Sequence, residues 1–377
     1  MKSSVGILTI DLTAIQKNWE RVSRQLDKKR TSTAAVIKAD AYGLGAPKVG
    51  RALYDVGCRE FFLATQEEAI AARAYLPADS ILYVLGGVRP GAERIFIDNR
   101  LIPVLFSLMD LRRWQSACEC TGVQGDCAIK INTGMTRLGL DLPELSIWLS
   151  SLSSFANTRP LLIMSHMACA DEPEHPLNEK QLAGFEDVVN LCRPQLPNAR
   201  FSFANSSGIF LGERWHFDLV RPGASLYGIN PQQSKPSPVL PVIRLDLPVI
   251  QIRRIIQSAT VGYGATTDVA PPSILAVVAG GYADGLHRTI GLHGQGSIEG
   301  YPVSITGRIS MDTSIFDVSS VPEELLQEES LMVQVLGKEL SLDVMMGRAG
   351  VLGYEILTSL GARYERRYIS DGKLDEQ

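Results

Sequence analysis

The feature that most constrains the fold is a succession of short apolar runs through the first 230 residues. The runs are rich in β-branched and aromatic residues, and most gaps between them carry apolar residues at helical spacing, as in residues 46–56 and 178–191. Strands that alternate with helices predict a parallel sheet, and eight such units predict an α/β fold of the (β/α)8 or TIM-barrel type, which typically takes about 250 residues. An open, doubly wound sheet is the alternative. The eight predicted strands are residues 34–38, 61–64, 81–85, 101–106, 127–131, 161–165, 201–204 and 217–220.

The pattern changes after Tyr227. Residues 230–238 form a proline-rich polar stretch that indicates a linker. Beyond it helical spacing is scarce, and we expect strands at residues 244–247, 250–253, 274–279, 303–305, 314–318 and 331–335. The sequence therefore predicts two domains, a barrel over residues 1–238 and a mostly β domain over residues 239–377.

Composition narrows the class of protein. The 377 residues are 45% hydrophobic, which is enough apolar material for a core, and the net charge of −4 gives no reason to expect a nucleic-acid partner. No apolar run reaches the roughly 18–20 residues of a membrane span. Asp11 lies where a secretion signal would be apolar. We therefore expect a cytoplasmic protein without a membrane partner.

Metal binding has no support in the sequence. The six cysteines include no C-x-x-C pair, and there is no His-Glu-x-x-His or calcium-loop pattern. We expect reduced thiols and no metal site.

Three places just after predicted strands carry groups suited to chemistry. Lys38 ends an apolar strand, where desolvation would lower its pKa and free the amine as a nucleophile, unless the side chain reaches solvent from the barrel rim. His166 follows the sixth strand and is either catalytic or structural. Small residues at 204–208 and 221–224 follow the seventh and eighth strands, where barrels usually bind phosphate.

Residues 35–45, AVIKADAYGLG, resemble the cofactor-lysine motif of alanine racemases, which are pyridoxal-phosphate enzymes with a barrel and a β domain. Further motifs of that family occur in the same order, and the similarity spans residues 7 to 367. They are KINTGMTRLG at 130–139, SHMA at 165–168, ANS at 204–206, RPGASLYG at 221–228, VGYG at 261–264, GYADG at 281–285 and GRISMD at 307–312.

The resemblance implies a set of roles around pyridoxal 5′-phosphate. Lys38 would hold the cofactor covalently and act as one catalytic base, and Tyr263 would be the base on the opposite face. Arg221 would face the pyridine nitrogen, with His166 bridging it toward Tyr263. The phosphate would be held by Tyr42, Ser206, Gly223, Ala224 and Tyr354.

The resemblance also implies how the substrate is bound. Arg137 would contact the substrate carboxylate, and Met311, Asp312 and Tyr282 would complete the pocket and its entrance. Lys130 has the spacing of a lysine that is often carbamylated in this family. The family's two domains meet across a homodimer, so Tyr263, Met311 and Asp312 would act on the partner's barrel.

The leading hypothesis is an isomerase that interconverts L- and D-alanine, either supplying D-alanine for peptidoglycan precursors or degrading it. A serine or broad-specificity racemase is an alternative, because residues 286–289, LHRT, depart from the pattern of many members near the pocket entrance. A barrel-type amino-acid decarboxylase is a further alternative, but decarboxylases of similar architecture have an acid at the pyridine nitrogen, where this chain would have Arg221. A non-catalytic pyridoxal-phosphate-binding protein is the last alternative, but such proteins lack the second domain that is predicted here.

Overall fold

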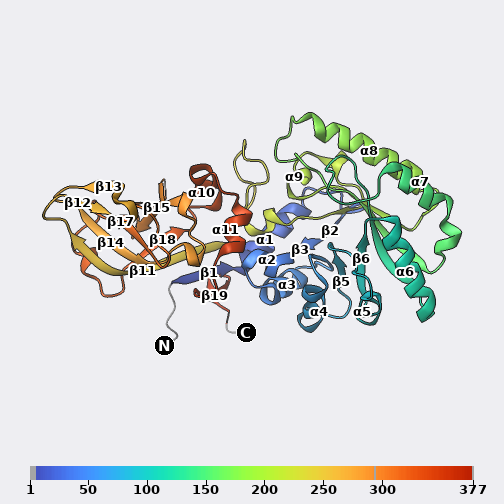
Figure 1. Cartoon of the computed structure of the whole chain (residues 1–377), viewed down its shortest axis with the longest axis horizontal. Coiled ribbons are helices and arrows are strands. Elements are labelled where there is room, and N and C mark those ends of the chain that lie inside the picture. Colours follow the sequence, from blue (N-terminus) through green and yellow to red (C-terminus); the bar gives the residue numbers. More distant parts are fainter. Residues whose placement is uncertain (1–5, 293, 376–377) are drawn as a thin grey trace. The chain divides into compact units, whose positions relative to one another are not determined.

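The computed structural model describes residues 6–292 and 294–375, which form two compact units. Residues Ile15–Val239 make up one unit, and the residues up to Ala14 together with those from Leu240 onward make up the other. The first unit contains the parallel strands and most helices, and the second is mostly β (Figure 1). We call them the barrel unit and the β unit.

The barrel unit is a ring of parallel strands. Seven strands pair in the order β3-β4-β5-β6-β7-β8-β9, and β10 pairs in parallel with β2, which precedes β3 by a single residue. The ring closes because Arg221 N donates to Ala204 O at 3.0 Å and Val36 N donates to Pro222 O at 2.9 Å. The predicted eightfold barrel is confirmed. The first of its eight strands consists of two short pieces, β2 (Ser32–Thr33) and β3 (Ala35–Val36), with one residue between them. The others are β4 (Glu60–Leu63), β5 (Ile81–Val84), β6 (Leu101–Leu105), β7 (Gly125–Lys130), β8 (Thr158–Met164), β9 (Arg200–Ser202) and β10 (Leu219–Val220).

Helices lie outside the curved row of barrel strands (Figure 1). Local sequence fixes several of their ends. Thr65 caps α4 by accepting a hydrogen bond from Glu68 N, and Gly122 ends α6 in the left-handed conformation that glycine adopts readily. The helices are α1 (Leu12–Ser23), α2 (Lys38–Gly43), α3 (Ala46–Asp55), α4 (Gln66–Tyr75), α5 (Glu93–Asp98), α6 (Leu108–Thr121), α7 (Leu142–Ser150), α8 (Pro176–Cys192) and α9 (Ser206–Ile209).

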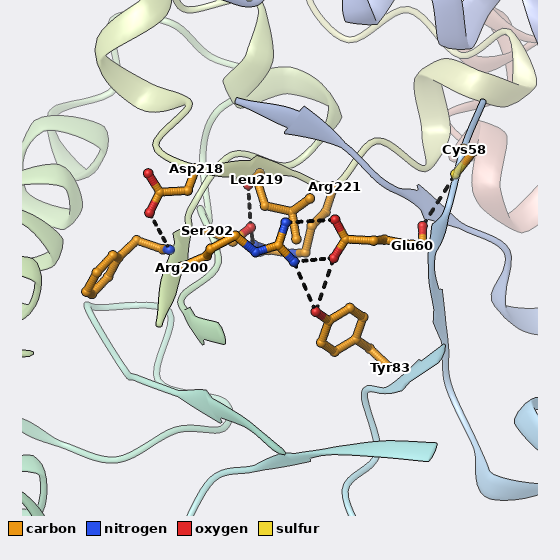
Figure 2. A network of polar contacts seen from close by, with 9 residues as sticks. Cys58, Glu60, Tyr83, Arg200, Ser202, Asp218, Leu219 and Arg221 are labelled. Atoms are coloured by element: carbon orange, nitrogen blue, oxygen red, sulfur yellow. Dashed lines mark hydrogen bonds and ion pairs between the residues drawn. The ribbon is translucent and has the colours of Figure 1, made fainter. Parts of the chain in front are cut away.

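The barrel interior is mostly apolar, and one charged cluster lies near its amino-terminal end. Glu60 begins β4 and Arg200 begins β9, and the two side chains pair through both carboxylate oxygens (Figure 2). The Tyr83 hydroxyl donates to Glu60 at 3.1 Å and accepts from Arg200 at 3.3 Å. The Tyr83 ring stacks on Phe62 with centroids 4.5 Å apart. Because this cluster is at the end of the barrel away from the usual active face, we assign it to stability.

The β unit is built around a closed ring of antiparallel strands. The long strand β11 pairs with both β14 and β18, and the order β14-β17-β16-β15-β18 completes the ring, which leaves no free edge among those strands. Its elements are β1 (Ile7–Asp11), β11 (Ile243–Arg254), β12 (Ala259–Val261), β13 (Thr267–Val269), β14 (Ile274–Ala279), β15 (Gln295–Ile298), β16 (Tyr301–Ile305), β17 (Thr313–Asp317), β18 (Met332–Leu336), β19 (Glu365–Ser370), β20 (Lys373–Leu374), α10 (Leu342–Ala349) and α11 (Gly353–Ser359).

The amino-terminal strand corrects one expectation. The sequence prediction placed residues 1–14 with the barrel, but β1 pairs antiparallel with β11 and parallel with β19, so it belongs to the β unit. The cause is local, because Leu8 and Ile10 alternate with polar residues and are fully buried between those two strands.

No helix within the described ranges is long and apolar enough to span a membrane.

Candidate active site

Lys38 begins a segment with an unusual backbone. It follows β3, and the next four residues, Ala39 to Tyr42, all have positive φ between 52° and 57°. For residues with a Cβ this left-handed turn costs roughly 1–2 kcal/mol per residue. Hydrogen bonds from Ala41 N to Ile37 O and from Gly45 N to Asp40 O, each 2.9 Å long, help to offset that cost. Lys38 and Tyr42 therefore belong to the same short turn.

Lys38 belongs to a group of positive side chains at the carboxyl ends of the barrel strands. Burial lowers its pKa, nearby Arg137 lowers it further, and Glu68 acts in the opposite direction. Burial also lowers the pKa of Lys130, at the end of β7, to about 8, with added repulsion from Arg137, Arg221 and Lys38. The pKa of His166 falls well below its usual value for the same reasons. Burial and the neighbouring cations therefore favour the uncharged form of these amines, which is the form that acts as a base or nucleophile.

Arg221 is the most deeply buried cation of this group. It is 4% exposed, and burial lowers its pKa to about 9. Its guanidinium donates to Ser202 Oγ and to Ser165 O, and it lies 3.4 Å from His166 Nδ1. Ser202 in turn donates to Leu219 O at 2.5 Å (Figure 2). The guanidinium is thus held in one orientation by neutral oxygens.

None of these cations has a salt bridge to a carboxylate within the part of the chain that the structure describes. A buried positive group without acidic partners is costly unless an anion joins it. The donor set therefore suits an anionic molecule. A reactive amine at Lys38 further suits one that carries a carbonyl group.

A second group of polar atoms lies after β9 and β10. Gly223 N donates to Ser206 Oγ at 2.9 Å, and Ser225 N donates to the same oxygen at 3.2 Å. A Cβ at Gly223 would lie 2.5 Å from the Tyr42 hydroxyl, so only glycine allows that hydroxyl to approach. Ala224 follows Gly223 and begins a short 3-10 turn, Ala224–Tyr227. Converging N–H and O–H groups of this kind fit a phosphate group, so the residues present fit pyridoxal phosphate.

The remaining predicted site residues belong to the β unit. Tyr263 begins a 3-10 turn, Tyr263–Ala265, between Gly262 and Gly264, and its side chain is 70% exposed. Tyr282 N donates to Ser310 O and Ala283 N donates to Met311 O, each at 3.0 Å. Tyr354 lies in α11. Nine of the predicted site residues thus belong to the barrel unit and five to the β unit.

Asp312 has a fixed environment. Arg363 Nη1 donates to its Oδ1 at 2.8 Å, while the other guanidinium nitrogens bind both carboxylate oxygens of buried Asp284. Asp284 also accepts from Gly281 N at 3.0 Å. One arginine therefore links the GYADG and GRISMD motifs.

Several of these partners were not foreseen from sequence. Glu68 contacts the turn of Lys38, and the Thr65-Gln66-Glu67-Glu68 pattern typical of a helix start could have indicated its orientation. Arg363 and Ser202 have no local signal, because each acts on a residue distant in sequence. No cluster of three His, Cys, Asp or Glu side chains suited to a metal occurs in residues 6–292 and 294–375.

Comparisons with known proteins give one consistent result. Residues 10–231 match the family model described as "Alanine racemase, N-terminal domain", and residues 242–368 match "Alanine racemase, C-terminal domain". A protein from Rhodospirillum rubrum named "Alanine racemase" is 46% identical over 97% of this chain and 96% of its own length. One from Agrobacterium fabrum named "Alanine racemase, catabolic" is 42% identical over 97% of this chain and 93% of its own. The solved structure of alanine racemase from Bartonella henselae, with covalently bound pyridoxal phosphate, has a TM-score of 0.90 and 37% identity and covers 97% of this chain and 100% of that one.

Proposed function

Because the chain belongs to the alanine racemase family, we propose that it interconverts L- and D-alanine with pyridoxal 5′-phosphate as its cofactor. The observation that carries the proposal is a group of positive side chains, Lys38, Lys130, Arg137 and Arg221, that have no salt bridge to a carboxylate in the described part of the chain, together with the polar groups of Ser206 and Gly223. An anionic phosphorylated carbonyl compound would compensate that charge. Racemisation is reversible, so the same reaction would supply D-alanine for wall precursors or remove it.

The cofactor, when bound, withdraws electrons from the substrate and makes its Cα proton acidic. The residues of the chain supply the rest. Burial lowers the pKa of Lys38, so its Nζ would hold the cofactor covalently and, once the substrate amine has displaced it, would take or return the Cα proton on one face. Tyr263 would take or return the proton at its hydroxyl on the other face. Two bases on opposite faces explain how the configuration is inverted.

Arg221 and Arg137 would control charge around the reaction. An arginine does not give up its proton readily, so Arg221 would leave the pyridine nitrogen unprotonated and limit side reactions such as transamination. His166, 3.4 Å from Arg221, would extend this contact toward the second base. Arg137 is exposed and would bind the substrate carboxylate through two hydrogen bonds.

Lys130 would carry a carbamate. Burial lowers its pKa to about 8, so a substantial fraction is neutral near that pH and can add carbon dioxide, releasing one proton. The resulting anion would face Arg137, whose positive charge now raises the energy of the Lys130 ammonium. Carbamylation would thus turn a repulsion into an attraction and orient Arg137.

The active site would be shared between two copies of the chain. Tyr263 and Met311 are 70% and 53% exposed, so both side chains are available to contact a partner subunit. A homodimer in which the β unit of one subunit covers the barrel of the other would bury them. Met311, Asp312 and Tyr282 would then line the substrate pocket, and Tyr354 would complete the phosphate site.

Mixing two inactive variants tests this arrangement. Lys38→Ala lacks one base and Tyr263→Phe lacks the other, so each alone should not racemise alanine. If the partner subunit's Tyr263 completes each site, unfolding and refolding an equal mixture should restore about a quarter of wild-type activity, because half of the dimers then hold one intact site out of two. Each variant refolded alone is the control. No recovery from the mixture would contradict the shared site, and near-normal activity of Tyr263→Phe would contradict the two-base mechanism.

A further inference from the structure

Glu68, on α4, makes two contacts that no role in the proposed mechanism explains. Its Oε1 accepts a hydrogen bond from Ala39 N at 2.8 Å, and its Oε2 accepts one from Ala64 N, also at 2.8 Å. Ala39 is the first residue of the left-handed turn, directly after Lys38. Ala64 directly follows β4. One carboxylate therefore joins the turn that carries the amine to the end of the neighbouring barrel strand.

The turn depends on contacts of this kind. No residue from Ala39 to Tyr42 is a glycine, and yet all four have positive φ. Such a backbone persists only where its surroundings fix it. Within the turn, Ala41 N and Gly45 N have backbone partners, whereas Ala39 N is bonded by Glu68. An ionised acceptor forms roughly twice as strong a hydrogen bond to N–H as a neutral one.

Among the residues that the structure describes, Glu68 contributes the one attractive charge that acts on Lys38. Arg137 repels the Lys38 ammonium and Glu68 attracts it. Besides burial, the negative charges of Asp40 and Glu68 raise the pKa of the Tyr75 hydroxyl, to about 12. The carboxylate thus ties the turn to the residue that follows β4 and adds a negative charge to the surroundings of Lys38.

We propose that Glu68 is a positioning residue for Lys38, in that its carboxylate fixes the left-handed turn and keeps one negative charge beside the amine. The inference deepens the proposed function and rests on it for the role of Lys38 toward the cofactor. Glu68 itself touches neither substrate nor reacting atoms in this account.

Replacing Glu68 by Gln removes the negative charge and keeps the size and shape of the side chain. The amide oxygen can accept from one N–H, but the amide nitrogen cannot accept from the other, and the negative charge is lost. The control is Glu67→Gln. It removes the same negative charge from the neighbouring residue, whose side chain has no hydrogen bond to the turn among the described residues. Thermal unfolding of both variants and the wild type establishes that all are folded.

The first readout needs no cofactor. Acetylation of Lys38 by acetic anhydride, followed by peptide mass spectrometry over a range of pH, gives the titration midpoint of the amine. Loss of the attracting charge lowers the pKa of Lys38, so Glu68→Gln should be acetylated faster than the wild type at a fixed pH below that pKa. Glu67→Gln should match the wild type. A midpoint in Glu68→Gln that stays in place or rises overturns the proposal.

The second readout is the attachment of pyridoxal phosphate, followed by its absorption band. We expect Glu68→Gln to bind at least about tenfold more weakly than Glu67→Gln, and Glu68→Ala more weakly still, because both N–H groups then lose their partner. Equal affinity of Glu68→Gln and Glu67→Gln would refute the positioning role. If the wild type itself attaches no cofactor at Lys38, the proposed function fails, while the acetylation profile still decides the role of Glu68.

Discussion

Removing Arg200 is expected to destabilise the barrel severely, because Glu60 is buried and would lose the cation that compensates it. Glu60 is 7% exposed, and its remaining partner would be the Tyr83 hydroxyl (Figure 2). Breaking a buried ion pair by removing one partner costs about 3–5 kcal/mol. The Arg200 side chain is 34% exposed, so water partly screens the pair and the lower end, about 3 kcal/mol, is the expected loss for Arg200→Met.

Tryptophan fluorescence in urea measures this loss. All four tryptophans lie in the barrel unit, at positions 19, 114, 148 and 215, so the signal follows that unit. The matched control is Arg159→Met, which breaks the more exposed pair with Asp126 and should cost less than about 1 kcal/mol. Adding Glu60→Gln to Arg200→Met should recover much of the loss, because no buried charge remains. A loss below about 1 kcal/mol in Arg200→Met would refute the reasoning.

Three further experiments test the site. The carbamate signal of Lys130 in carbon-13 NMR, at fixed dissolved carbon dioxide, should grow as pH rises through about 8, because only the neutral amine reacts; a signal independent of pH would contradict the assignment. Arg363→Lys keeps the positive charge but loses the planar guanidinium that binds the carboxylates of Asp284 and Asp312, so Asp312 should be released. KM for alanine should then rise roughly tenfold with little change in kcat, and an unchanged KM would argue against a role of Arg363 in placing Asp312. Gly223→Ala places a Cβ 2.5 Å from the Tyr42 hydroxyl and should weaken pyridoxal-phosphate binding at least about tenfold in an absorbance titration, and wild-type affinity would show that this approach does not matter.

Much of the fold could be predicted because its strands are short, apolar and bounded by turns. The run at residues 274–279 coincides with β14, and the eight barrel strands fall close to their predicted places. The exceptions include β1, whose partners are distant, and the local hairpin of β12 and β13, which the sequence analysis did not predict. β1 was missed because it pairs with strands more than 230 residues away, and Pro248 divided one long strand, β11, into two predicted ones.

The site was predictable to the extent that the barrel gathers residues that follow its strands. Lys38, His166, Ser206 and Arg221 all lie after strand ends at the same face, and their roles stay predictions. The left-handed turn was not predictable, because nothing in residues 39–42 favours positive φ by itself. The conformation is fixed by Glu68 and by backbone bonds, which form only in the folded barrel.

Chiral chromatography of purified protein with pyridoxal phosphate tests the central claim most directly. The protein is incubated separately with L-alanine, L-serine and a panel of other L-amino acids, with Lys38→Ala as the control. The account predicts that D-alanine forms faster than any other D-isomer and that Lys38→Ala forms none. Faster conversion of another amino acid would contradict the assignment of alanine as the substrate, and the absence of every D-isomer despite bound cofactor would contradict racemisation itself.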